Sequence, residues 1–175
     1  MIIGFVGFKQ VGKSTASLHL VENYNFHRLN FKDGLVREMK QRFPDLLEEI
    51  AKMHLCTIDG LFEEKPPLMR ALMQNFGTDV MRDIDPLYWV KQWIKALPEN
   101  KNIVVDDVRF LNEAECVQSR GGIIIRLERD DIINGGSHES ETQNLKIKHD
   151  HVIKVAKGDH EGLYRELDKI ISQHD

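Results

Sequence analysis

A glycine-rich stretch near the N-terminus has the spacing of a phosphate-binding loop. Residues 7–15 read GFKQVGKST and follow the apolar run IIGFV. They match G-x-x-x-x-G-K-[ST], in which successive backbone N–H groups wrap the phosphates of a nucleotide, the lysine reaches the β and γ phosphates and the hydroxyl binds Mg²⁺. The alternative is an ordinary glycine-rich turn between a strand and a helix. The residues predicted to hold a nucleoside triphosphate are Gly7, Val11, Gly12, Lys13, Ser14 and Thr15, with Ser14 as a Mg²⁺ ligand.

A second candidate group lies in the stretch VVDDVRFLNEAE. Asp106 and Asp107 end a predicted strand, where open parallel sheets place their ligands. A carboxylate there would hold Mg²⁺ or orient a substrate hydroxyl, Arg109 would grip a phosphate with two hydrogen bonds, and Glu113 would contact a sugar or base. As alternatives, the aspartates cap a helix that starts near Phe110, and Glu113 is a solvated helix residue.

A third candidate group lies in residues 70–93, RALMQNFGTDVMRDIDPLYWVKQW, where a predicted helix separates polar and apolar positions onto two faces. Gly77 costs roughly 1 kcal/mol relative to alanine inside a helix, which indicates a close approach of a ligand or of another helix. The polar face carries Arg70, Gln74, Gly77 and Thr78, and the apolar face carries Leu68, Leu72, Phe76 and Val80.

The charged and aromatic residues around this helix leave two interpretations open. Arg70 and Arg82 contact a ligand, or they pair with acidic neighbours such as Asp79 and Asp83 on the surface. Trp89 stacks on a nucleotide base or fills the core, and Trp93 is predicted to be a core residue.

A fourth group contains arginines after an apolar run. Arg126 and Arg129 lie where a closing flap would bring guanidinium groups over a transferring phosphoryl group. His138 and Glu141 are candidates to hold that flap. The alternative is a charged, solvated segment. His149 and His151 have no third ligand at a known spacing, so we do not predict a zinc site.

These side chains require a scaffold of alternating strands and helices. Short β-branched runs alternate with helical patterns, which predicts an α/β protein with a parallel sheet covered on both faces. HRLNF is the most polar run and is expected near an edge. The predicted strands are 2–6, 27–31, 102–106, 122–127 and 151–155. Residues 33–100 are too many for a simple crossover, so we expect an inserted helical arm there, and a lid at about 128–148, within a single domain 1–175.

Bulk composition excludes several classes of protein. The 175 residues suit about one domain, and 41% hydrophobic with 30% charged residues is typical of a soluble protein. A net charge of −4 argues against a nucleic-acid polymer as partner. The sequence shows neither a membrane span nor a signal peptide, so a cytoplasmic location is expected. The two cysteines form no C-x-x-C pattern and are expected to be reduced, and the number of subunits, including a homodimer, stays open.

The motifs together resemble the deoxynucleoside monophosphate kinases of tailed bacteriophages and their bacterial relatives. The resemblance rests on GFKQVGKST, R-x-x-x-Q-x-x-G-T-x-x-x-R followed by Trp89, D-x-R-F-x-N-E from Asp107, and H-x-S-E from His138. The sequence departs from the family pattern at Gly34, where many relatives carry proline. The resemblance implies an adenylate-kinase-like core with a five-stranded parallel sheet, an arm that binds a monophosphate and an arginine-bearing lid.

The resemblance also implies roles for individual residues. Lys13 and Ser14 would bind ATP and Mg²⁺, Asp107 and Arg109 would form the acceptor-side pair, and Arg126 and Arg129 would be lid arginines. The implied acceptor pocket contains Arg70, Gln74, Thr78, Arg82 and Glu113. The implied reaction transfers the γ-phosphoryl group of ATP to a (deoxy)nucleoside monophosphate.

Two rival functions stay open. The first is another small-molecule P-loop kinase, such as a dephospho-coenzyme A kinase, for which D-x-R-F-x-N-E is a poorer match. The second is a nucleotide-dependent switch without catalysis. Regulatory GTPases carry N-K-x-D and D-x-x-G, and neither occurs in the required place in this sequence.

Overall fold

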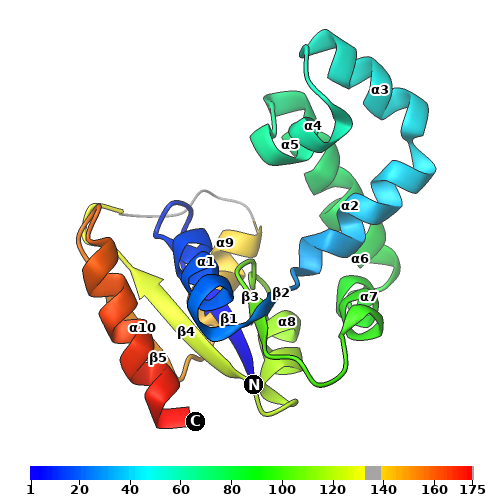
Figure 1. Cartoon of the computed structure of the whole chain (residues 1–175). Helices are drawn as coiled ribbons and strands as arrows, with labels where there is room; N and C mark the ends of the chain where they lie inside the picture. The colour runs from blue at the N-terminus through cyan, green and yellow to red at the C-terminus, as the bar shows by residue number, and fades with distance from the viewer. Residues whose placement is uncertain (133–138, 175) are drawn as a thin grey trace. The chain divides into compact units, whose positions relative to one another are not determined.

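The computed structural model describes residues 1–132 and 139–174, and it describes only the backbone of 139–141 (Figure 1). The chain forms two compact units. One comprises Met1–Asn30 together with Leu97–Asp175, and the other is the intervening segment Phe31–Ala96.

The first unit is built on a sheet of five parallel strands in the order β2-β3-β1-β4-β5. This confirms the predicted parallel sheet. The edge position expected for the most polar strand is also confirmed, because β2 lies at one end of the sheet and both of its residues are exposed. The strands are β1 (Ile2–Val6), β2 (His27–Arg28), β3 (Ile103–Val105), β4 (Ile123–Glu128) and β5 (His151–Lys154).

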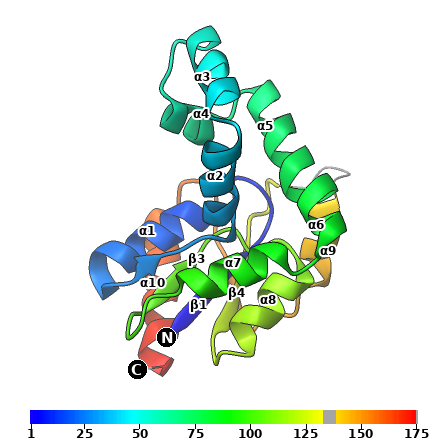
Figure 2. The same ribbon diagram turned by 90° about the vertical axis from the view of Figure 1, so that its right-hand side faces the viewer.

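Helices cover both faces of this sheet, as the alternation of side chains along β1 requires (Figures 1 and 2). Ile3 and Phe5 pack in the apolar cluster formed with α1 (Lys13–Tyr24) and α10 (His160–His174). Gly4 faces the other way, where an added Cβ would lie only 2.7 Å from Ile124 and 3.6 Å from Val117 of α8 (Leu111–Gln118). Helix α9 (Glu139–Lys146) contacts α8. The unit is therefore a three-layer α/β/α fold.

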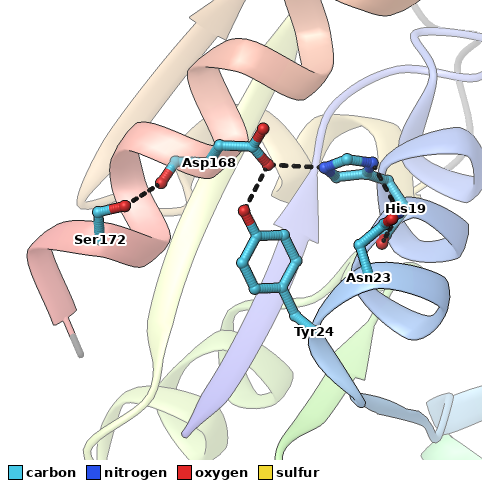
Figure 3. A network of polar contacts seen from close by, with 5 residues as sticks. All are labelled: His19, Asn23, Tyr24, Asp168 and Ser172. Atoms are coloured by element: carbon cyan, nitrogen blue, oxygen red, sulfur yellow. Dashed lines mark hydrogen bonds and ion pairs between the residues drawn. The ribbon is translucent and has the colours of Figure 1, made fainter.

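A polar network joins the C-terminal helix α10 to α1 (Figure 3). Asp168 Oδ1 lies 2.7 Å from His19 Nε2 and accepts a hydrogen bond of 2.8 Å from the Tyr24 hydroxyl. The His19 ring also stacks on Tyr164, with ring centroids 4.2 Å apart. Burial opposes ionisation of Asp168, but the hydrogen bonds from His19 and Tyr24 outweigh it and lower the pKa of the carboxyl group.

Replacing Asp168 with asparagine should therefore destabilise the protein in a pH-dependent way. A carboxyl group whose pKa is lower in the folded state stabilises the protein above its unfolded pKa of about 3.9, and this contribution is lost as the pH falls through the folded value. We expect the free energy of unfolding to fall by about 1 kcal/mol at pH 7, because the carboxylate is half exposed, and to fall little at pH 2. Urea unfolding at both values measures this. Glu166→Gln on the same helix is the control, and equal losses in the two variants would contradict the prediction.

The second unit is helical. Its core contains Leu47, Leu61, Met69, Phe76 and Trp89, among others. The helices are α2 (Phe31–Arg42), α3 (Pro44–Met53), α4 (Ile58–Glu64), α5 (Pro67–Gln74), a π-helix η1 (Asn75–Val80), α6 (Met81–Ile84) and α7 (Tyr88–Ala96).

The structure corrects the apolar face expected for residues 68–80, on α5 as well as in the π-helix. Leu68 and Val80 are 46% and 40% exposed, whereas Met69 and Met81 are 0% and 5% exposed. The backbone N–H of Met81 donates to the Phe76 carbonyl, an i to i+5 hydrogen bond. Because a π turn contains more residues than an α turn, the position that follows Phe76 in the core is Met81 and not Val80.

Candidate functional site

The loop between β1 and α1 requires glycine at two positions. Gly7 has φ 138°, and an added Cβ would lie 2.4 Å from the Leu127 carbonyl oxygen, so any side chain would collide with the backbone of β4. Gly12 has φ 104° and precedes the first turn of α1. Glycine at these two positions gives the loop a backbone conformation that other residues adopt only with strain, as a loop that approaches a phosphate closely requires.

The side chains of this loop divide between anchoring and exposed roles. Val11 is 2% exposed and packs in the core cluster, so it anchors the loop. Lys13 Nζ donates to the carbonyl oxygens of Gly7 and Phe8, each at 2.7 Å. Ser14 is exposed at the start of α1, and Thr15 is half-buried. Lys13 therefore lies against its own loop and has to turn away from these carbonyls to reach a phosphate.

Two adjacent aspartates, Asp106 and Asp107, follow β3, and both are buried. Asp106 Oδ2 lies 2.6 Å from Arg28 Nη2, its Oδ1 accepts from Asn30 Nδ2 at 2.8 Å, and its backbone N–H donates to Asn30 Oδ1 at 3.0 Å. Both carboxylate oxygens of Asp106 are thus engaged in fixing β2 to β3. Asp107 is 8% exposed. Neither aspartate is the N-cap of α8, which is Phe110.

Glu113 has a structural role that the sequence interpretation missed. Its Oε2 accepts the backbone N–H groups of Arg109 at 2.8 Å and Phe110 at 3.1 Å, and the residue is 2% exposed. A glutamate at the third position of a helix commonly reaches back to the N-cap N–H, and its place three residues after Phe110 was the available signal. The Glu113 carboxylate caps the N-terminus of α8, and Glu113 is therefore not a solvated helix residue.

Arg109 and Arg129 lie on loops at the carboxyl edge of the sheet. Arg109 is exposed, and its guanidinium forms no hydrogen bond or ion pair within the ranges that the structure describes. Arg129 Nε and Nη2 bind Asp131 at 2.8 and 2.7 Å, and Nη1 donates to the Gln10 carbonyl at 2.7 Å. The hydrogen bond from Arg129 lowers the pKa of Asp131. Arg129 therefore contacts the phosphate-binding loop directly.

Arg126 lies inside the protein at 7% exposure, on β4 beside Val6 of β1. Its guanidinium donates to Asn144 Oδ1 at 3.4 Å, to the carbonyl oxygens of Asn144 and Ile147 at 2.8 and 3.2 Å, and to His149 Nδ1 at 3.2 Å. Burial lowers the pKa of Arg126. The alternative of a charged, solvated segment is wrong for this residue, because its donors are occupied by protein acceptors.

The second unit carries the residues expected to bind the acceptor. Arg70 and Gln74 are exposed on α5, Thr78 is half-buried in the π-helix, and Arg82 Nη1 lies 3.5 Å from the Pro86 carbonyl oxygen. π-helical turns occur frequently at functional sites.

Gly77 and Trp89 belong to the packing of the second unit. An added Cβ on Gly77 would lie 3.1 Å from Leu35 of α2, so the glycine permits a close helix crossing. Trp89 is 3% exposed, and its indole N–H donates to the Gly77 carbonyl at 2.7 Å. Trp93 is 2% exposed, which confirms it as a core residue. Of the two alternatives for Trp89, the structure favours the core.

The remaining predictions concern the flap and metals. His138 and the side chain of Glu141 lie outside the described residues, as do residues 133–138 of the expected lid. Within the described residues, no group of three or more His, Cys, Asp or Glu side chains is arranged to hold a metal ion. Cys56 and Cys116 are free thiols, and no helix in the described ranges is long and apolar enough to cross a membrane.

The fold and the loop define a class of protein. A parallel five-stranded sheet carries a glycine-dependent loop between its central strand β1 and α1, and basic side chains lie at the same edge of the sheet. This is the architecture of the P-loop nucleotide-binding proteins.

Comparison with known proteins specifies the family within this class. The family model "Deoxynucleotide monophosphate kinase" matches residues 57–167, more than half of the chain. A putative deoxynucleotide monophosphate kinase of Acanthamoeba polyphaga mimivirus is 28% identical over 183 aligned positions, covering 95% of this chain and 94% of the viral protein. The chain belongs to the deoxynucleotide monophosphate kinase family, and it is therefore a nucleotide kinase.

Solved structures share the fold at low sequence identity. TT1252 from Thermus thermophilus has a TM-score of 0.52 and 17% identity, with 99% of this chain and 97% of that chain covered. Dephospho-CoA kinase from Campylobacter jejuni has a TM-score of 0.49 and 14% identity over 98% and 96% of the two chains. Only the first of these likenesses supports the fold, and neither bears on the substrate.

Proposed function

We propose that this protein transfers the γ-phosphoryl group of ATP to a (deoxy)nucleoside monophosphate, giving ADP and the (deoxy)nucleoside diphosphate. The observation that carries the proposal is the loop at Gly7–Lys13, whose backbone conformation admits only glycine at two positions and whose lysine lies against the loop. Membership of the deoxynucleotide monophosphate kinase family supports a monophosphate as acceptor.

The residues of the first unit act by positioning and by charge. Lys13 turns from the Gly7 and Phe8 carbonyls to the β and γ phosphates, while the loop N–H groups hold the remaining phosphate oxygens. Arg129, held over the loop at Gln10, and Arg109 neutralise charge on the transferring group. The acceptor oxygen attacks in line, so no covalent enzyme intermediate is needed.

Mg²⁺ is the metal that the available donors fit. The Ser14 hydroxyl and the Asp107 carboxylate are hard oxygen donors at the carboxyl ends of neighbouring strands β1 and β3. Both oxygens of Asp106 are engaged with Arg28 and Asn30. We propose Asp107 as the acidic ligand because it is the first residue of the D-x-R-F-x-N-E motif that resembles the family. When bound, Mg²⁺ neutralises charge on the triphosphate.

The unit Phe31–Ala96 is proposed as the acceptor-binding arm. Arg70 and Gln74 are exposed on α5 and are accessible to a ligand. An exposed arginine provides a planar fork that matches phosphate geometry, whereas the amide of Gln74 has the donors and acceptors needed to read a base. Thr78 and Arg82 lie further along the same helical segment and complete the proposed pocket.

A steady-state assay with ATP and a panel of acceptors tests this proposal. ADP release should require a (deoxy)nucleoside monophosphate and should stay near background with ATP alone, because a kinase site has to exclude water. Chromatography should show the matching diphosphate. Turnover with dephospho-coenzyme A, and with none of the monophosphates, would favour a different small-molecule P-loop kinase. ATP binding with no acceptor-dependent turnover would favour the non-catalytic switch.

A further inference from the structure

A buried asparagine on α9 contacts the start of the phosphate-binding loop. Asn144 is 2% exposed, and its Nδ2 donates to the Gly7 carbonyl oxygen at 3.4 Å. Its Oδ1 and its own backbone carbonyl accept from Arg126 at 3.4 and 2.8 Å. Asn144 thus links α9, β4 and the loop, although the two residues of the Asn144–Gly7 contact lie 137 positions apart in the sequence.

Arg126 holds this asparagine in place. Beyond its two bonds to Asn144, the guanidinium donates to the Ile147 carbonyl at 3.2 Å and to His149 Nδ1 at 3.2 Å. Asn144 lies near the end of α9, and the other two acceptors lie in the segment that follows this helix. Because the guanidinium is rigid and planar, it fixes the Asn144 amide relative to β4.

The Gly7 carbonyl receives hydrogen bonds from two side chains, Asn144 and Lys13, the latter at 2.7 Å. Gly7 is itself confined, because an added Cβ would lie 2.4 Å from the Leu127 carbonyl oxygen. When Lys13 turns to the phosphates, this buried carbonyl loses one donor. A buried carbonyl without a donor is costly, so the second donor becomes more important in the nucleotide-bound state.

We propose that Asn144 is a positioning residue for nucleotide binding: its amide keeps the Gly7 carbonyl hydrogen-bonded when Lys13 leaves it for the phosphates. The inference rests on the proposed function in so far as Lys13 binds the phosphates of ATP. Asn144 acts through the loop and does not touch the nucleotide. Its contribution therefore depends on Lys13, and this dependence distinguishes positioning from a general contribution to stability.

A double-mutant cycle measures that dependence. The affinity for AMP-PNP with Mg²⁺ is measured by calorimetry for the wild type, Asn144→Leu, Lys13→Ala and the double variant. With Lys13 present, Asn144→Leu should weaken binding about tenfold, because the bound state then leaves the Gly7 carbonyl without either donor. In the Lys13→Ala background the Gly7 carbonyl has no lysine donor in either the free or the bound state. Asn144→Leu should therefore weaken binding by less than about twofold in that background.

Two further variants keep the test decisive. Asn144→Asp retains the acceptor for Arg126 and removes the donor to Gly7, so it should show the same difference between the two backgrounds even if Asn144→Leu does not fold. Thr142→Leu is the control, because Thr142 is an exposed polar residue on the same helix, so its affinity should equal that of the wild type. Equal weakening by the Asn144 variants in both backgrounds would overturn the inference, and so would equal weakening by Thr142→Leu. If the wild type does not bind AMP-PNP, the proposed function itself fails. If the wild type binds AMP-PNP but the Asn144 variants weaken binding equally with and without Lys13, only the role of Asn144 is contradicted.

Discussion

Replacing Lys13 with alanine is expected to lower kcat by about a thousandfold while the protein remains folded. The ammonium group stabilises negative charge that grows on the phosphoryl oxygens during transfer, and no other described lysine lies on this loop after Gly12. Lys13 Nζ donates to carbonyls of its own loop, at Gly7 and Phe8. Lys13 does not belong to the buried apolar core, so we expect its replacement to leave the sheet and its packing intact.

The measurement is acceptor-dependent ADP release combined with thermal unfolding followed by circular dichroism. Lys154→Ala is the matched control, since this lysine lies on β5 and forms a surface pair with Asp130. It removes the same charge and should retain nearly full activity. Turnover of Lys13→Ala at a rate close to that of Lys154→Ala would refute the assignment of the loop as the catalytic phosphate site.

Replacing Arg109 with alanine is the second substitution with a large expected effect. We expect kcat/KM for the monophosphate to fall about a hundredfold, because a guanidinium group on a phosphate both positions it and neutralises its charge. Arg109 is exposed, and its side chain forms no hydrogen bond or ion pair within the described part of the chain. The free energy of unfolding should accordingly change by less than about 0.5 kcal/mol. Arg109→Lys should recover only part of the loss, because an ammonium cannot form two parallel hydrogen bonds.

Initial rates at varied monophosphate and varied ATP test this prediction. Arg165→Ala is the control, because Arg165 is an exposed arginine on α10 and its loss changes the net charge equally. A KM for the monophosphate that stays at the wild-type value in Arg109→Ala, with unchanged kcat, would remove Arg109 from the site.

Much of the first unit could be predicted because its signals are local in the sequence. IIGFV and GIII are continuous apolar runs, as buried parallel strands require. The loop motif is also contiguous, and it places glycine at the two positions, Gly7 and Gly12, that have positive φ. In the second unit, the predicted four-residue step was wrong already on α5, where Met69 and not Leu68 is buried, and in η1 a single π turn moved the core position after Phe76 to Met81. No spacing rule for α-helices predicts that change.

The sequence by itself determined which segments form the strands of the sheet and where a phosphate can approach the backbone. Only the tertiary structure decided how the charged side chains are used. Asp106 is engaged by Asn30 from 76 positions away, and Arg126 is engaged by the end of α9 and the segment that follows it. A carboxylate or guanidinium group has the same chemistry whether it binds a ligand or a neighbouring element, so its role depends on which acceptors and donors the fold places beside it.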